Sequence, residues 1–164
     1  MNDLDEQHHS PDREDASSGT PWRKRVMRAS SQASAEELAQ GVASLGDAEG
    51  VTNIREPETG LVMLRGRMGG DGRPFNFGEA TVTRAVVKLH SGEIGFSYLL
   101  GRSKTAARHA AVLDAFAQRK SDANELETNF VAIVENRVSA EVTQRAQKTD
   151  ATRVDFFTLV RGED

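Results

Sequence analysis

The chain has 164 residues, of which 37% are hydrophobic and 28% are charged, which is lean but sufficient for the core of one domain. Its formal net charge is −4, and residues 1–20 alone hold six acids and one base. The remainder is therefore nearly neutral, which argues against a general nucleic-acid-binding protein. The absence of cysteine excludes disulfides, thiolate metal ligands, iron–sulfur clusters and thiol catalysis.

Two further features bear on domain organisation and location. No apolar run approaches the ~20 residues that a membrane-spanning helix needs, and the acidic N-terminal segment lacks the apolar stretch of a signal peptide. We therefore expect a cytoplasmic protein that does not enter a membrane. Residues 1–20 are polar and acidic and cannot bury enough surface to offset their ordering entropy. We expect a disordered tail there, followed by a single domain over residues 21–164.

Two short helices are predicted at the start of the domain. The basic segment 21–30 carries its apolar residues on one side, as an amphipathic helix does. A second helix is predicted over residues 34–45, because Ser34 and Glu37 have the spacing of a capping box and Gly46 follows the last apolar residue. Together they predict an N-terminal helical hairpin.

A β-hairpin is predicted next. The runs 51–56 and 61–68 have strand composition. They flank Pro57-Glu58-Thr59-Gly60, in which proline presets φ and glycine tolerates a positive φ. Side chains alternate between the two faces of a strand. One face of the second run should therefore carry four side chains: Leu61, Met63, Arg65 and Arg67.

Two more strands and two helical regions follow. A Gly-rich loop over residues 69–77 leads to strands at 79–90 and 94–101, which would complete an antiparallel meander. Four side chains of the last of these strands should share a face: Ile94, Phe96, Tyr98 and Leu100. Helical periodicity then covers residues 103–120 and 124–148, with a break expected near Glu135.

The final run, residues 153–160, is apolar on both faces. It predicts a strand that is buried in the sheet or against another subunit. The expected fold class is α+β, with an antiparallel sheet of four to five strands, the N-terminal helical hairpin, and helices after the fourth strand.

Residues 65–85 hold four arginines, five glycines and two phenylalanines. Glycine permits close approach of the backbone, and arginine offers planar donors that suit phosphate, phosphonate or carboxylate. The segment thus indicates an anion site or a tight protein interface, while edge arginines that deter aggregation are the simplest interpretation. Arg67 and Arg84 are its candidates for phosphate contact.

Arg102, Ser103 and Lys104 stand where a strand gives way to a helix. Their spacing does not match a nucleotide-binding P-loop. Free N–H groups at a helix start favour an anion, which makes Arg102 and Lys104 further candidates for phosphate contact. The alternative is an ordinary helix cap flanked by solvated charges.

No catalytic centre is visible in the sequence. His8 and His9 lie in the tail, His90 ends a strand, and His109 is expected to be a partly buried structural residue on a helix. No motif of a hydrolase or metalloprotease occurs, no metal site is indicated, and no pair of carboxylates stands out for acid–base work. Asp155 in its apolar run would need a cation, which could come from Arg153, Arg84 or a partner.

Three separated blocks together resemble one family: TGLVMLRGRMGGDGRPFNFGEATVTRAVVKL, GFSYLLGRSKTAA and ATRVDFFTLVRG. They resemble the G subunits of the bacterial carbon–phosphorus lyase core complex, the PhnG family. The resemblance runs in order from Trp22 to Asp164, is loose over residues 120–150, and leaves out the acidic tail.

The resemblance implies a function in phosphonate catabolism. Members work with H, I and L subunits to transfer the ribose triphosphate of ATP to an alkylphosphonate, which releases adenine and gives ribose 1-phosphonate 5-triphosphate. The core assembly also contains a J subunit, and the G subunit binds I tightly. The resemblance attributes the chemistry to the larger subunits, so the chain would be an accessory subunit that is not catalytic alone. It would hold no cofactor, and ATP and phosphonate would be substrates of the complex.

An obligate subunit should present interface residues. The candidates for partner contact are Trp22, Arg65, Phe75, Phe77, Arg153, Phe156 and Phe157. Two other hypotheses stay open: a pure scaffold whose arginines contact only partner chains, and an independent anion-binding module.

Overall fold

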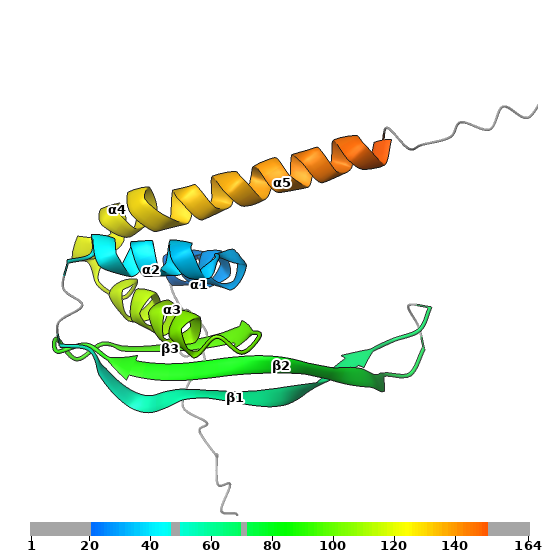
Figure 1. The fold of residues 1–164 in the computed structure, drawn as a ribbon, viewed down its shortest axis with the longest axis horizontal. Helices are drawn as coiled ribbons and strands as arrows, with labels where there is room; N and C mark the ends of the chain where they lie inside the picture. The colour runs from blue at the N-terminus through cyan, green and yellow to red at the C-terminus, as the bar shows by residue number, and fades with distance from the viewer. Residues whose placement is uncertain (1–20, 47–49, 70–71, 151–164) are drawn as a thin grey trace, which may run out of the picture.

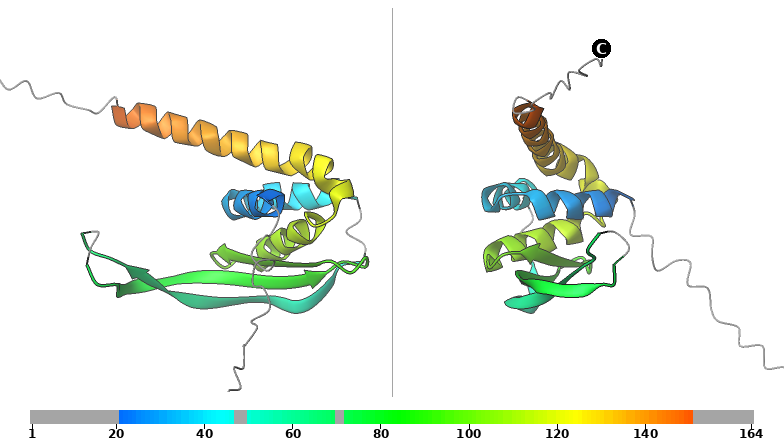
Figure 2. Two further views of the ribbon diagram at one scale, coloured as in Figure 1. Left: turned by 180° about the vertical axis from the view of Figure 1, so that it is seen from behind. Right: turned by 90° about the vertical axis from the view of Figure 1, so that its right-hand side faces the viewer.

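The computed structural model describes residues 21–46, 50–69 and 72–150 of the chain. Figure 1 shows a sheet with helices stacked on one face: α3 lies on the sheet, α1 and α2 lie on α3, and α5 is outermost. The views in Figure 2 show the same layers and leave the opposite face of the sheet without helices. The predicted α+β class is confirmed, whereas the predicted tail and the strand at residues 153–160 lie outside the described residues. None of the described helices is long and apolar enough to cross a membrane.

The sheet has three antiparallel strands, not four to five. β1 (Thr52–Gly66) continues straight through Pro57-Glu58-Thr59-Gly60, so the predicted hairpin is wrong. Its register against β2 shifts on both sides of Arg55, and such irregularities accommodate a proline, which lacks an N–H, on an edge strand. Gly60 does not adopt a positive φ, so the chain does not turn there. The helices accordingly follow the third strand rather than a fourth.

β2 (Phe75–Lys88) pairs with β1 on one side and with β3 (Ile94–Leu100) on the other. It begins at Phe75, earlier than the predicted strand, so residues 75–77 of the predicted Gly-rich loop belong to the strand. β3 confirms the strand predicted at 94–101. Its outer face, away from the helices, exposes the predicted row: Ile94, Phe96, Tyr98 and Leu100. Its inner face turns Gly95 and Ser97 into the core.

α3 (Lys104–Phe116) is the centre of the core. Ser103 caps its start by accepting a hydrogen bond from the Ala106 N–H at 3.2 Å. The helix lies within the predicted range of 103–120 but ends at Phe116. It is buried on nearly every side, because the sheet covers one flank and α1 and α2 cover the other.

α1 (Pro21–Gln32) and α2 (Ala35–Ser44) confirm the two predicted N-terminal helices. The capping box is present: Glu37 N donates to Ser34 Oγ at 3.1 Å, and Ser34 N donates to the Glu37 carboxylate at 2.7 Å. The predicted hairpin does not form, because each helix packs on the small side chains of α3 instead. Val26 of α1 and Leu38 of α2 are buried there.

The last helical stretch consists of η1 (Lys120–Asp122), α4 (Ala123–Leu126), the π-helical turn η2 (Glu127–Val131) and α5 (Ala132–Asp150). The break predicted near Glu135 is absent, and the irregularity is the π turn just before α5. Phe130 and Val131 in that turn are both buried. Phe130 packs closely on Gly41, where a Cβ would lie 2.8 Å from the ring. The π turn allows the helix to bury Phe130 and Val131, which are neighbours in the sequence, at the same time.

A buried ion pair joins α1, α3 and β3. Asp114 is 1% exposed, and its carboxylate accepts hydrogen bonds from Arg23 Nε and Nη2, each at 2.8 Å. The same carboxylate accepts the backbone N–H of Phe96 at 2.9 Å. The bond to Asp114 raises the pKa of Arg23. A buried carboxylate needs such compensation, because removing one partner leaves an unpaired charge in the core.

We predict that Asp114→Ala lowers the free energy of unfolding by about 3 kcal/mol, since it orphans the Phe96 N–H and the Arg23 guanidinium. Urea denaturation followed by circular dichroism measures this change. Glu141→Ala removes an exposed carboxylate that pairs with Arg137 within α5. It is the control, with an expected effect below about 0.5 kcal/mol. Equal effects of the two substitutions would contradict the prediction.

Gly95 gives a second stability prediction. A Cβ at this position would lie 2.0 Å from the Ala111 carbonyl oxygen and 2.5 Å from Ala115 N, so α3 can approach β3 only because residue 95 lacks a side chain. Gly95→Ala should cost more than about 2 kcal/mol of stability. Gly78→Ala, in β2 with open space around the added methyl group, should shift the urea midpoint little. A tolerated Gly95→Ala would disprove the close approach.

Candidate functional site

The β1–β2 ribbon projects beyond the helices as an arm, which we define as residues 60–81. Figures 1 and 2 show it extending past α3 on the side to which α5 also points. The burial pattern along β2 agrees: residues 75–81 are exposed or half-buried, and buried positions begin at Val82. The arm therefore belongs to the sheet but not to the core.

Four exposed apolar side chains lie along the arm. Thr83 and Ala85 of β2 face the helices, so alternation places Thr81 and Glu79 on the same side of the sheet. Leu61 and Met63 stand opposite Thr81 and Glu79 and so face that side too. The exposed fractions in this patch are Leu61 64%, Met63 54%, Phe75 43% and Phe77 59%.

The register shifts between Leu64 and Arg65, where β1 advances by one residue while β2 advances by two, from Gly78 to Asn76. The extra residue, Phe77, thus lies in β2, and a bulge interrupts the alternation of the strand that holds it. The predicted alternation of Leu61, Met63 and Arg65 along β1 is therefore uninterrupted. Arg67 lies just beyond the end of β1 and is exposed.

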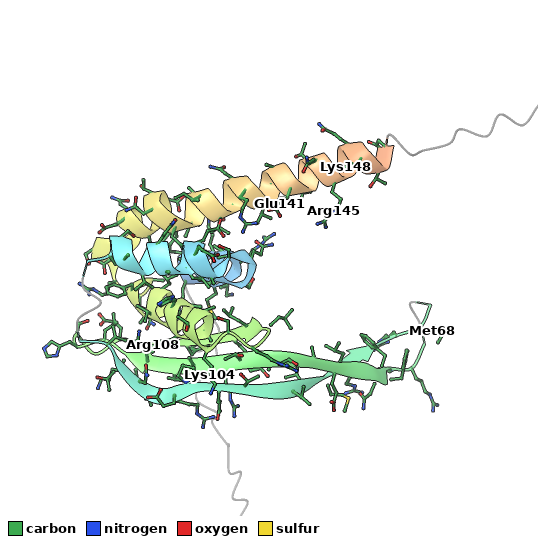
Figure 3. The ribbon with its side chains drawn as sticks, in the orientation of Figure 1. Met68, Lys104, Arg108, Glu141, Arg145 and Lys148 are labelled. Carbon is green, nitrogen blue, oxygen red and sulfur yellow. The ribbon has the colours of Figure 1, made fainter. Side chains whose placement is uncertain are left out.

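The tip of the arm is rich in arginine. Arg65, Arg67 and Arg73 are all exposed there, close to Met68, which Figure 3 labels at the tip. Among the described residues, none provides a carboxylate for an ion pair with any of the three. The tip thus offers cationic groups to a partner or a ligand.

Arg84 differs, because it already has a carboxylate partner. It lies on the outer face of the sheet, and its Nε is 2.5 Å from Glu58, which also binds Arg55 at 2.7 Å. These bonds, that of Arg84 above all, lower the pKa of Glu58. A phosphate that approached Arg84 would have to displace Glu58, so Arg84 is a weaker candidate for anion contact than Arg67.

Arg102 and Lys104 flank the cap of α3 and are exposed. Figure 3 shows Lys104 under the helical body and Met68 at the far tip. The Gly101 N–H donates to the Thr81 carbonyl, and the strand from Thr81 to Phe75 spans about 20 Å. The four candidates for phosphate contact, Arg67, Arg84, Arg102 and Lys104, are therefore not brought together by this chain.

Trp22 packs mainly against the core of its own chain. It lies half-buried on α1, packed against the core, with the Arg25 guanidinium 5.9 Å from the centre of its ring. Contact of Trp22 with a partner stays a prediction. The remaining candidates, Arg153, Phe156 and Phe157, lie outside the described residues, as does Asp155.

The described residues do not form an acid–base or metal centre. They contain no group of three histidines, cysteines or acids that could hold a metal ion. The one buried carboxylate in the described core, Asp114, is held by Arg23. His90 is exposed, and His109 is partly buried on α3 beside Arg108.

The sequence interpretation missed Leu61 and Met63 as surface residues. The signal was present: period-two alternation placed them on the same face as residues that were judged exposed. The predicted hairpin concealed this signal, because the strands of a short hairpin would have packed on the core. The observed strands form a long ribbon that extends beyond the core.

Comparison with known proteins identifies the family. The model of the family "Phosphonate metabolism protein PhnG" matches residues 22–162. The chain belongs to the PhnG family. It is also 46% identical over 146 residues to the alpha-D-ribose 1-methylphosphonate 5-triphosphate synthase subunit PhnG of Rhizobium meliloti (strain 1021), with 89% of this chain and 93% of that relative covered. The resemblance seen in the sequence is therefore confirmed.

We predict that His109 makes the stability of the chain pH-dependent. Burial, with the nearby Arg108 charge, lowers the pKa of His109 below its usual value of 6.5, and its Nδ1 is buried without a hydrogen-bond partner among the described residues. The unfolded chain therefore binds a proton that the folded chain resists, so stability should be lost as the pH falls below 6.5 and through the lowered pKa. Thermal melts from pH 7.5 to 5 should show a steeper loss for the native chain than for His109→Gln; parallel curves would exclude the effect.

Proposed function

We propose that this chain is a subunit of the enzyme complex that makes ribose 1-phosphonate 5-triphosphate from ATP and an alkylphosphonate. The observation that carries the proposal is the relative from Rhizobium meliloti, which is 46% identical over 93% of its length and whose name states that activity for methylphosphonate. We infer that the partners are the H, I and L subunits in the transfer step, with J in the core assembly, and that the complex works in the cytoplasm, where ATP is available.

The chemistry favours an accessory role for this chain. An oxygen of the phosphonate attacks the anomeric carbon of the ribose, the bond to adenine breaks, and the leaving adenine takes a proton from a general acid. Asp114, the one carboxylate buried in the described core, is bound by Arg23 and is therefore not available as that acid. We infer that the acid comes from a larger subunit.

The contribution of this chain would be binding and positioning. Arginine can neutralise a triphosphate or a phosphonate and hold the reactants in line. Arg67 suits this role better than Arg84, because Arg84 is already paired with Glu58. Arg67 stands at the tip of an arm that leaves the body of the subunit, where it can reach into a site formed by another chain.

A pure scaffold is the second candidate. The apolar side chains of the arm support it, because Leu61, Met63, Phe75 and Phe77 stay exposed in the isolated chain. Residues of this type are enriched at protein interfaces and depleted on free surfaces. In this alternative the arginines of the tip bind only partner carboxylates.

We predict that Arg67→Ala in the assembled complex lowers kcat/KM for adenine release from ATP and methylphosphonate at least tenfold, or about 1.4 kcal/mol, while assembly measured by gel filtration stays normal. Arg145→Ala, an exposed arginine of α5, is the matched control and should leave the rate unchanged.

Other outcomes separate the hypotheses. Normal assembly with an unchanged rate for Arg67→Ala would assign this chain to the scaffold. If H, I and L released adenine at full rate without this chain, the proposed function itself would be wrong.

A further inference from the structure

We propose that the free edge of β1 in the arm accepts a β-strand from another subunit, an extended segment with alternating apolar residues and acidic residues toward the tip. This inference rests on the proposed function, because it names how the complex holds this chain. Three features of the sheet support it: the β3 edge is covered, backbone groups of β1 point outward, and apolar and cationic side chains lie beside that edge.

The two edges of the sheet differ. β3 is closed by side chains: Asp114 accepts the outward N–H of Phe96 at 2.9 Å, and Gln118 Nε2 donates to the outward carbonyl of Ile94 at 2.8 Å. β1 lies at the other edge. No described residue covers its distal half in this way, and an edge of that kind is a template for pairing with another chain.

The direction of the backbone groups of β1 follows from the ladder. The Thr81 carbonyl accepts from Gly101 on the β3 side, so Thr81 does not bond to β1. Its opposite residue, Leu61, therefore points its N–H and C=O away from β2, because both groups of a strand residue point to one side. By the same alternation Met63 points outward, whereas Val62 bonds to β2.

The usable edge is about one strand long. Near the body of the subunit, the register shifts around Arg55 and the missing N–H of Pro57 spoil regular pairing. At the far end, the shift after Leu64 ends the regular ladder. Thr59 to Leu64 lies between these limits without interruption, which matches a short added strand.

The side chains define the chemistry of the occupant. Leu61 and Met63 are exposed on the helix-side face of the arm, so an added strand would continue that apolar patch with its own alternate residues. Arg65 and Arg67 lie beside the edge at the tip and have no carboxylate partner among the described residues. Acidic residues at that end of the added strand would complement them. A ribbon of two strands is marginal in water by itself, so a third strand would also stabilise the arm.

Hydrogen exchange tests the backbone claim directly. The full chain is compared alone and in the complex with co-expressed H, I and J subunits, at single-residue resolution. The amides of Leu61 and Met63 should exchange at least tenfold more slowly in the complex. The amide of Val62, bonded to β2 in both states, is the internal control. Unchanged exchange of Leu61 and Met63 in an intact complex would overturn the inference and leave the proposed function standing, whereas failure of the native chain to assemble would contradict the proposed function.

Substitutions test the same edge by affinity. Met63→Pro removes one outward N–H, which an edge strand tolerates, and Met63→Ala removes the same apolar side chain while keeping the N–H. Met63→Pro should bind the co-expressed subunits at least tenfold more weakly than Met63→Ala, with circular dichroism and melting temperature confirming that both variants fold. Equal binding by the two folded variants would exclude pairing at this edge.

Charge reversal tests the acidic end of the occupant. Arg65→Glu should weaken assembly about five- to tenfold at 50 mM salt and less at 500 mM, since salt screens exposed charges. Assembly unaffected at both salt concentrations would contradict an acidic partner segment.

Discussion

The carboxylate of Asp114 organises the protein, because three separate elements depend on it. It binds Arg23 of α1 through two hydrogen bonds, accepts the Phe96 N–H at the edge of β3, and is itself part of α3. Burial of a charge in the core is tolerated because both carboxylate oxygens accept hydrogen bonds. The carboxylate that holds α1 also covers the β3 edge, so the described sheet keeps one edge open, that of β1.

Ion pairs link α1, which Asp114 holds in place, to α5. Arg25 bridges Glu127 and Glu135 across the π turn at 2.8 and 2.5 Å, and these bonds raise the pKa of Arg25. Arg137 of α5 reaches back to Glu37 and to the Gln32 carbonyl. Exposed pairs of this kind add little stability each, but together they fix the direction in which α5 leaves the body. The arm and α5 thus project from one body toward the same side (Figure 1).

This architecture presents an exposed arm and an open sheet edge to other chains. The buried carboxylate of Asp114 is held by Arg23, and the candidate arginines lie at separate places on the surface. Exposed apolar side chains lie along the arm and along the outer face of β3. In a multisubunit transferase, such a subunit can position the larger chains relative to one another. It can also place an arginine in a site that those chains form. The open β1 edge is consistent with the proposed function, because a subunit of a complex needs a surface that another chain can bind.

The sequence by itself determined the family, the α+β class, the capping box at Ser34, the helix within residues 103–120 and the strand at 94–101, because each depends on local spacing or on a long run of matched residues. Only the tertiary structure decided the rest. Pro57 and Gly60 have the composition of a turn, but pairing with β2 along the whole of β1 outweighs that local preference. The bulge opposite Leu64 adds Phe77 to β2, and such an extra residue cannot be read from the alternation of the sequence. Whether Arg84 and Asp114 are available to a ligand depended on Glu58 and Arg23, which lie far from them in sequence and are brought beside them only by the fold.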